Sequence, residues 1–298
     1  MSTPLLALVA SRVRFEEKQL LDELDRRGIP HQQVDARSFS MELSAAEPAR
    51  LPYRVALIRE ISQTRSYYAA RLLEQAGVRT VNPSAVIEAC GDKLRTSLLL
   101  TRAGVRTPRT AVALAPEGAL AAMRRIGYPV VLKPLSGSWG RLVAVARDEE
   151  TATALLEHRS ALPAPQQHVI YIQQLIDSPG RDIRVIMVSG EPAGAIYRRA
   201  TAGWRANIAL GARPEPCPLT PGLAAACRDA ARAVSGGSPD GTVLGVDLIE
   251  DLSGVPHVLE VNHNVEFRGF TTVHASPRVA EVIVAEAQRI LGGAPCAP

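Results

Sequence analysis

Apolar and polar positions follow two different patterns in the first third of the chain. Leu5–Ala10 and Arg54–Arg59 are short, mostly apolar runs, which are typical of buried strands. Glu16–Arg27 and Thr64–Gln75 instead repeat apolar residues at helical spacing, and a glycine follows closely after each. A further apolar run, Val78–Val81, comes next. Strands that alternate with helices predict an α/β lobe at the N-terminus.

Strands predominate in the rest of the chain. A helix is expected from Asp92 to Thr101, and Thr107–Pro108 marks the change of lobe. The runs that read as strands are Val130–Pro134, Leu142–Ala146, Val169–Leu175, Ile183–Val188, Ala193–Arg198, Val243–Asp247 and His257–Asn262, with helices at Glu149–His158 and Pro221–Val234. This order favours an α+β half laid against the α/β lobe, with predicted boundaries of 1–92, 93–170 and 171–298.

Composition narrows the class of protein. The chain of 298 residues is 46% hydrophobic, which is enough to bury a full core in two or three lobes around one cleft. Its net charge is +4, but the arginines are scattered and aromatic residues make up 4%, which argues against a nucleic-acid surface. A modest positive field suits acidic small substrates or an acidic protein partner.

The compartment is predicted from cysteines and from the lack of a targeting segment. Cys90, Cys217, Cys227 and Cys296 form no CxxC pair and have no histidines at zinc spacing, so we expect free thiols in a reducing compartment. The apolar start is short and its arginines follow it, unlike a secretory signal. No run reaches membrane-spanning length, and the cytoplasm is the expected location.

The sharpest local signal is a strand that ends in a lysine and leads into a loop of small residues. It reads Val131-Leu132-Lys133-Pro134, then Leu135-Ser136-Gly137-Ser138-Trp139-Gly140-Arg141. Backbone amides of such a loop can hold phosphate oxygens, and the lysine can meet the same charge. A surface hairpin with a solvated lysine explains the segment equally well, and the Walker pattern is absent.

Two apolar strands deliver oxygen ligands at or near their ends. Gly245-Val246-Asp247-Leu248 and Leu259-Glu260-Val261-Asn262 carry the carboxylates and the amide that Mg²⁺ prefers, with phosphates completing the shell. Acidic residues at the ends of strands are often simply exposed to solvent. The predicted phosphate loop upstream in the same chain nevertheless strengthens the interpretation as a metal site.

Arginines recur on consecutive predicted strands. Arginine forks bind phosphate and carboxylate groups with two parallel hydrogen bonds. Arg199 reads as part of a solvated face. The candidates for anion binding are Arg184, Arg198, Arg205 and the neighbouring Asn207.

The order of these motifs resembles that of ATP-grasp ligases over nearly the whole chain. The matching segments are Gly91-Asp92-Lys93, Val131-Leu132-Lys133-Pro134, the glycine loop, Tyr171-Ile172-Gln173-Gln174-Leu175-Ile176, Arg181-Asp182-Ile183-Arg184, Trp204-Arg205-Ala206-Asn207 and Glu260-Val261-Asn262. The stretch from Glu260 to Arg268 is similar to that of the LysX and ArgX type, which attaches an amino acid to an amino-group carrier protein. The RimK glutamate ligases are related to this type.

The resemblance implies a role for each matching residue. Lys93 and Lys133 would reach the phosphates of ATP while Ser138, Trp139 and Gly140 cover them. The adenine hinge would be Gln173, Gln174, Leu175 and Ile176, with Asp182 near the ribose. The family commonly has an acidic residue where this chain has Gln174, so a side-chain contact to adenine is in question there.

The resemblance also implies the metal and catalytic groups. Asp247, Glu260 and Asn262 would hold Mg²⁺, expected as two ions with Mn²⁺ as a substitute. Arg184, Arg198, Arg205 and Asn207 would stabilise an acyl phosphate, because phosphoryl transfer needs charge neutralisation and alignment more than a protein nucleophile.

The implied partners are a small acidic amino-group carrier protein and an acidic amino acid. The amine of glutamate or α-aminoadipate would attack the activated side chain of the carrier's C-terminal glutamate. The residues that vary with substrate in the family are Glu266, Phe267, Arg268, Gly269 and Phe270. Gly269-Phe270 resembles members that load glutamate, although Phe270 would also fit a core position.

Two alternatives remain open at this point. One is a RimK-like ligase that adds glutamate to another acceptor, and the other is a nucleotide-binding protein without turnover. Both lysines and all three metal ligands are present, which argues against the second. The family tendency implies a homo-oligomer, either a dimer or a tetramer, and lysine, arginine or specialised metabolism are all compatible with the sequence.

Overall fold

The N-terminal lobe is a parallel sheet with helices on both sides. The computed structural model describes residues 5–43, 50–137, 141–201, 211–274 and 278–293. The strands are β1 (Leu6–Val9), β2 (His31–Val34), β3 (Val55–Ile58) and β4 (Arg79–Val81), in the order β2-β1-β3-β4. The helices are α1 (Phe15–Arg26), α2 (Gln63–Gln75) and α3 (Ser84–Cys90). All residues of β1 and β3 are buried, as expected for strands covered on both faces.

The central lobe contains a four-stranded antiparallel sheet. Its strands are β5 (Thr110–Ala113), β6 (Val130–Lys133), β7 (Ala144–Ala146) and β8 (Ile170–Gln174), in the order β5-β8-β6-β7. The other elements are α5 (Pro116–Ile126), α6 (Glu149–Ser160) and a 3₁₀ turn, η1 (Pro165–His168). Strand β7 begins later than predicted, since Leu142 lies in the left-handed region at φ 56°. The predicted boundary at residue 170 stays a prediction, and β8 pairs with strands of the central sheet.

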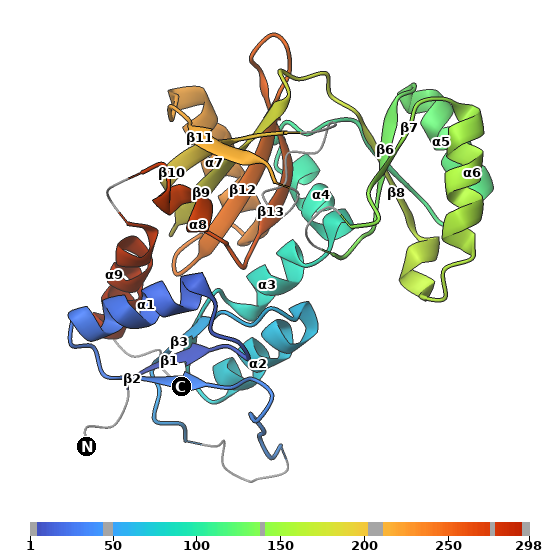
Figure 1. The fold of residues 1–298 in the computed structure, drawn as a ribbon. Helices are drawn as coiled ribbons and strands as arrows, with labels where there is room; N and C mark the ends of the chain where they lie inside the picture. The colour runs from blue at the N-terminus through green and yellow to red at the C-terminus, as the bar shows by residue number, and fades with distance from the viewer. Residues whose placement is uncertain (1–4, 44–49, 138–140, 202–210, 275–277, 294–298) are drawn as a thin grey trace.

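The C-terminal lobe supplies the platform of the site. Its strands are β9 (Arg181–Val188), β10 (Glu191–Arg199), β11 (Arg213–Pro216), β12 (Val243–Glu250) and β13 (Pro256–Asn262), in the antiparallel order β11-β10-β9-β12-β13. Its helices are α7 (Pro221–Val234), α8 (Arg268–Thr271) and α9 (Val279–Gly292), and α4 (Lys93–Arg102) packs beside α7. Figure 1 shows α4 and α7 at this sheet, with α5 and α6 covering the separate central sheet.

The C-terminal helix α9 returns to the N-terminal lobe. Figure 1 shows α9 (red) beside α1 (blue). Leu20 and Leu24 of α1 share a core with Ile283 and Val284 of α9. The two ends of the chain therefore pack together, and α8 is held between α1 and the C-terminal sheet. Helices α5 and α9 are missing from the pattern-based prediction, because α5 is rich in small apolar residues and α9 in β-branched ones.

A buried asparagine joins the N-terminal lobe to the C-terminal sheet. Asn82 follows β4 and is 2% exposed. Its amide nitrogen donates to the carbonyls of Val243 (2.8 Å) and His263 (2.6 Å), and its oxygen accepts from the Val243 amide (2.6 Å). One side chain thus satisfies three buried backbone groups next to the proposed metal ligands.

We expect Asn82→Ala to lower the free energy of unfolding by about 2–4 kcal/mol, because it leaves those backbone groups without a partner. Denaturant unfolding monitored by circular dichroism measures the change. Thr80→Ala is the control, since Thr80 Oγ1 bonds to Glu74 (2.6 Å) within the same lobe. An equal loss in both variants would contradict the bridging role.

Candidate active site

Residues from all three lobes line one cleft of about 800 Å³. Arg14, Ile61 and Gln63 come from the N-terminal lobe, Ser136 from the central lobe and Arg184 from the C-terminal sheet. Ligand sites in proteins usually have volumes of about 300–1,000 Å³ and often lie between domains. The cleft is therefore large enough for a nucleotide and a second substrate.

Two carboxylates lie directly opposite each other on the cleft face of the C-terminal sheet. Asp247 of β12 pairs in register with Glu260 of β13, and Gly245 pairs with Asn262. The Asn262 amide nitrogen lies 3.3 Å from Asp247 Oδ2 and 3.4 Å from Glu260 Oε1. Opposed like charges destabilise a sheet unless cations offset them.

The offsetting cations come from neighbouring strands and from α4. Arg184, opposite Asp247 on β9, donates two hydrogen bonds to its carboxylate at 2.7 and 2.6 Å. Arg198 forms a second pair of bonds with Asp182, at 2.6 and 2.7 Å, and also lies 3.3 Å from Asp247. Lys93 Nζ lies 3.2 Å from Glu260. This set of seven side chains, Asp182, Arg184, Arg198, Asp247, Glu260, Asn262 and Lys93, is called the charge ladder below.

Burial and charge shift the proton affinities of this set. Burial alone raises the pKa of Glu260, but the nearby Lys93 and Lys133 ammonium groups outweigh it and hold the pKa below its usual range. Burial lowers the pKa of Lys133 to about 8. Its ammonium donates to Gln173 Oε1 at 2.6 Å. A polyphosphate next to this amine favours the charged form.

The donor set fits a magnesium ion that is shared with phosphates. Among the described residues, no group of three His, Cys, Asp or Glu side chains could hold a metal ion by itself. Asp247, Glu260 and Asn262 instead offer two carboxylates and one amide, joined by the hydrogen bonds given above. Mg²⁺ commonly takes only one or two protein carboxylates and completes its shell with water and phosphate oxygens.

The structure brings some predicted nucleotide residues to the cleft and leaves others behind its wall. Lys93 lines the cleft, whereas Gln173 is 2% exposed and bonds to Thr110 (3.1 Å) and Tyr171 (3.2 Å). Gln174 and Leu175 donate their backbone amides to neighbouring carbonyls. Several predicted residues are outside the cleft lining, and their predicted contacts with nucleotide or metal stay predictions. They are Lys133, Gln173, Gln174, Leu175, Ile176, Asp182 and the predicted metal ligand Asp247. Ser138, Trp139, Gly140, Arg205 and Asn207 lie outside the described residues.

The predicted substrate segment follows β13 and borders the same cleft. Glu266, Arg268, Gly269 and Phe270 line it, whereas Phe267 is 1% exposed and packs edge-on against Phe15, with ring centroids 6.5 Å apart. Phe270 is also buried. The core interpretation therefore holds for both aromatic rings, and Phe270 has a cleft-facing edge as well.

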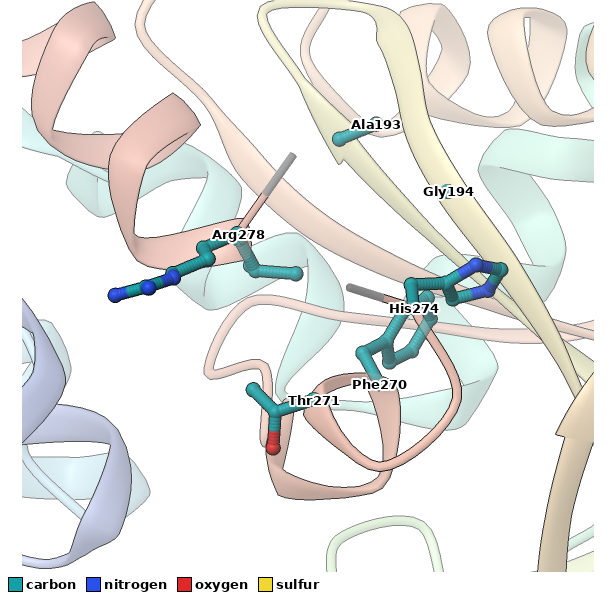
Figure 2. A pocket seen from close by; sticks show the side chains of 7 residues that line it. Ala193, Gly194, Phe270, Thr271, His274 and Arg278 are labelled. Atoms are coloured by element: carbon teal, nitrogen blue, oxygen red, sulfur yellow. The ribbon is translucent and has the colours of Figure 1, made fainter. Parts of the chain in front are cut away.

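A second, smaller cavity of about 60 Å³ lies behind Phe270. Figure 2 shows Phe270 and His274 beside β10 at Gly194, with Arg278 across the cavity. His274 Nε2 bonds to the Ala195 carbonyl at 2.8 Å. A Cβ on Gly194 would lie 3.6 Å from the Phe270 ring, so the ring rests against bare backbone. Phe270 separates this cavity from the main cleft.

Several lining residues were missed by sequence reasoning. Arg14, Phe15, Glu16 and Gln63 reach the cleft from the N-terminal lobe. Gln63 accepts a hydrogen bond from His263 Nε2 at 2.5 Å, and burial lowers the pKa of His263 to about 4, so this ring is neutral. No local motif marks these positions, because their neighbours at the site are distant in sequence.

Comparisons with known proteins agree with this geometry. A family model described as the RimK-like ATP-grasp domain matches residues 90–283, and one described as the LysX preATP-grasp domain matches residues 6–89. The chain belongs to the RimK-like ATP-grasp family. The predicted fold class, the resemblance and the assignment as an ATP-grasp ligase are thereby confirmed. Ligases of this family use ATP and Mg²⁺ in general.

Similar proteins cover almost the full length of this ATP-grasp ligase. The glutamate–LysW ligase ArgX of Sulfurisphaera tokodaii is 34% identical, over 93% of this chain and 97% of its own. The α-aminoadipate–LysW ligase LysX of the same organism is 33% identical, over 91% and 93%. The crystal structure of a RimK domain ATP-grasp protein from Sphaerobacter thermophilus has a TM-score of 0.75 at 26% identity and covers 95% of this chain and 98% of its own. Within the described residues, no helix is both long and apolar enough to cross a membrane.

We expect Lys133→Ala to weaken binding of ATP by about tenfold or more, because the polyphosphate loses a buried cation that offsets its charge. Isothermal titration calorimetry measures the affinity. Lys18→Ala is the matched control, since Lys18 is exposed on α1. Equal affinities in the wild type and Lys133→Ala would remove Lys133 from the nucleotide site.

We expect Glu260→Gln to abolish Mg²⁺-dependent release of phosphate while the protein stays folded, because the neutral amide is a poor magnesium ligand. A phosphate-release assay with all substrates present, over a titration of Mg²⁺, tests this. Glu250→Gln serves as control, because Glu250 ends the same β12 strand as Asp247 but pairs with Arg181 (3.5 Å). Unchanged turnover in Glu260→Gln would mean that the metal assignment is wrong.

Proposed function

We propose that this ATP-grasp ligase joins the α-amine of glutamate or α-aminoadipate to the side-chain carboxylate of the C-terminal glutamate of an amino-group carrier protein. The observation that supports the proposal is that one cleft is lined both by five members of the charge ladder and by Glu266, Arg268, Gly269 and Phe270. The five are Lys93, Arg184, Arg198, Glu260 and Asn262. The names of the similar ArgX and LysX proteins, which refer to LysW, support a carrier protein as the acceptor. The net charge of +4 complements an acidic carrier.

The reaction follows from charge neutralisation and alignment. The carrier carboxylate attacks the γ-phosphate of ATP, ADP leaves, and the amine then displaces phosphate from the acyl phosphate to form an amide. Lys93 and Lys133 bind the phosphates, while Arg184 and Arg198 stabilise the acyl phosphate. Asp247, Glu260 and Asn262 would hold Mg²⁺, which would supply positive charge to offset the negative charge of the phosphates. We propose two ions, with Mn²⁺ as a substitute.

Glutamate is the proposed amino acid. The two candidates differ by one methylene, which is worth about 1–3 kcal/mol in a fitted pocket. Phe270 supports the shorter substrate, because its ring closes the cleft wall and the cavity of about 60 Å³ lies behind it. A RimK-like reaction on a different acceptor is the second candidate, favoured by the family match over residues 90–283. We further propose a cytoplasmic homo-oligomer, either a dimer or a tetramer.

Mass spectrometry of the carrier tests the proposal. The protein is incubated with ATP, Mg²⁺ and a small acidic carrier ending in glutamate, with glutamate or α-aminoadipate supplied in turn. We expect the carrier to gain one glutamate residue, because the segment 266–270 lies beside the phosphate-binding groups. A carrier whose last glutamate is replaced by glutamine is the control. ATP turnover without a change in carrier mass would favour the second candidate.

A further inference from the structure

Residues 264–268, which begin two positions after the end of β13, are each held by the N-terminal lobe. We call residues 264–268 the anchored segment. Asn264 Nδ2 donates to the Glu60 carbonyl at 2.9 Å, and the Val265 carbonyl accepts from Arg59 Nη2 at 2.9 Å. Further contacts at Glu266, Phe267 and Arg268 come from the start of α1. The C-terminal sheet therefore carries this segment, but another lobe sets its conformation.

Glu16 makes the most direct of these contacts. It is 5% exposed, and its Oε1 accepts from the backbone amides of Phe267 (3.2 Å) and Arg268 (3.1 Å). These amides begin the short helix α8, where backbone N–H groups lack partners within the helix. Hydrogen bonds to an ionised acceptor are about twice as strong as neutral ones. A carboxylate from the first turn of α1 thus caps α8, more than two hundred residues away.

A series of ion pairs, buried at Glu17 and Arg59, runs beside Glu16 and reaches the same segment. Glu17 is fully buried and accepts from Arg14 Nε (3.0 Å) and Arg59 Nε (3.1 Å). Burial opposes ionisation of Glu17, but these two guanidinium groups outweigh it and keep its pKa low. Arg14 extends the series to Glu266, at 2.9 Å. Because Arg14 and Arg59 pair with Glu17, the Glu16 carboxylate can accept hydrogen bonds from the two backbone amides.

The anchored segment forms part of the cleft lining. Glu266 and Arg268 line the cleft, and the Arg268 guanidinium lies over the Phe15 ring, 5.5 Å from its centroid. Within the described residues, the Arg268 guanidinium makes no hydrogen bond or ion pair inside the protein. Its position therefore depends on its own backbone, which Glu16 holds, and on stacking against the residue before Glu16.

We propose that Glu16 is a positioning residue for the amino-acid substrate: it fixes the backbone at Phe267 and Arg268, and thereby the place where the side chains of this segment meet that substrate. This inference rests on the proposed function, in which the segment 266–270 binds the amino acid. Glu16 acts through the backbone amides that it holds. Its loss should weaken binding of the amino acid more than binding of ATP.

Steady-state kinetics of Glu16→Ala and Glu16→Gln test the proposal. We expect Glu16→Ala to raise the KM for glutamate about tenfold, because two charge-assisted hydrogen bonds are lost, and to leave the KM for ATP within about twofold. Glu16→Gln keeps an accepting oxygen, and we expect it to restore most of the loss. Such a rescue distinguishes positioning from simple loss of packing.

Glu23→Ala is the matched control. Glu23 lies on the same helix, is 6% exposed, and bonds to Arg26 (2.7 Å) and Arg27 (2.5 Å) away from the cleft. We expect it to lower thermal stability without changing the KM for glutamate. If Glu16→Ala and Glu23→Ala changed both KM values alike, or if Glu16→Ala left the KM for glutamate unchanged, the proposal would be wrong.

Hydrogen exchange separates this inference from the proposed function. Mass spectrometry of the wild type and Glu16→Ala should show faster exchange in peptides covering residues 264–272 and unchanged exchange in β12. No amino acid is needed for this measurement. A wild type that loads no amino acid would overturn the proposed function, whereas unchanged exchange at Phe267 and Arg268 would overturn the role of Glu16.

Discussion

The site depends on two carboxylates that face each other across a pair of strands in a partly buried cleft. Asp247 and Glu260 lie opposite in the β12–β13 ladder, where like charges repel. The sheet tolerates this arrangement because Arg184 is in register with Asp247 on the other side, and because α4 begins with Lys93 beside Glu260. Strand order therefore determines which cation neutralises which acid.

This pairing has a consequence for anion binding. Arg184 and Arg198 already donate to carboxylates, so phosphate oxygens must share these donors or take them over. A cation that binds Asp247 would weaken the hydrogen bonds that Asp247 accepts from Arg184. Metal binding and arginine availability are thus linked through one carboxylate, because the Asp247 oxygens that a cation would bind already accept from Arg184 and lie near Arg198. The arrangement agrees with a family that combines ATP with Mg²⁺.

Sequence patterns predicted the parts of the site that depend on short-range geometry. Asp247 and Glu260 lie within β12 (Val243–Glu250) and β13 (Pro256–Asn262), neighbouring strands joined by a short connection, so their approach follows from antiparallel pairing of the two strands. The phosphate loop predicted after Lys133 stays a prediction, since residues 138–140 lie outside the described part of the chain. The pairing of Arg198 with Asp182 was not predicted, because it depends on the register of β9 with β10.

The sequence did not indicate which residues of the N-terminal lobe reach the site. Glu16 stands in the first turn of an amphipathic helix, where an acidic residue is ordinary because it complements the helix dipole. Helix α9, which follows the C-terminal sheet, packs against α1. Its sequence is rich in β-branched residues, which are not typical of helices. Only the packing of the first helix on the last reveals that this acid caps α8.

Chain connectivity then explains why the N-terminal lobe matters to chemistry on the C-terminal sheet. Asn262 ends β13, and the anchored segment begins two residues later, so the proposed metal ligands and the segment 266–270 are separated by only a short stretch of backbone. The sheet fixes one end of that stretch, while Asn82 and Glu16 fix the next residues from the N-terminal lobe. A short segment held at both ends has few conformations to lose when ligand binds. The distance between the phosphate-binding groups and the proposed amino-acid site is consequently set by contacts between lobes, and not by the sheet alone.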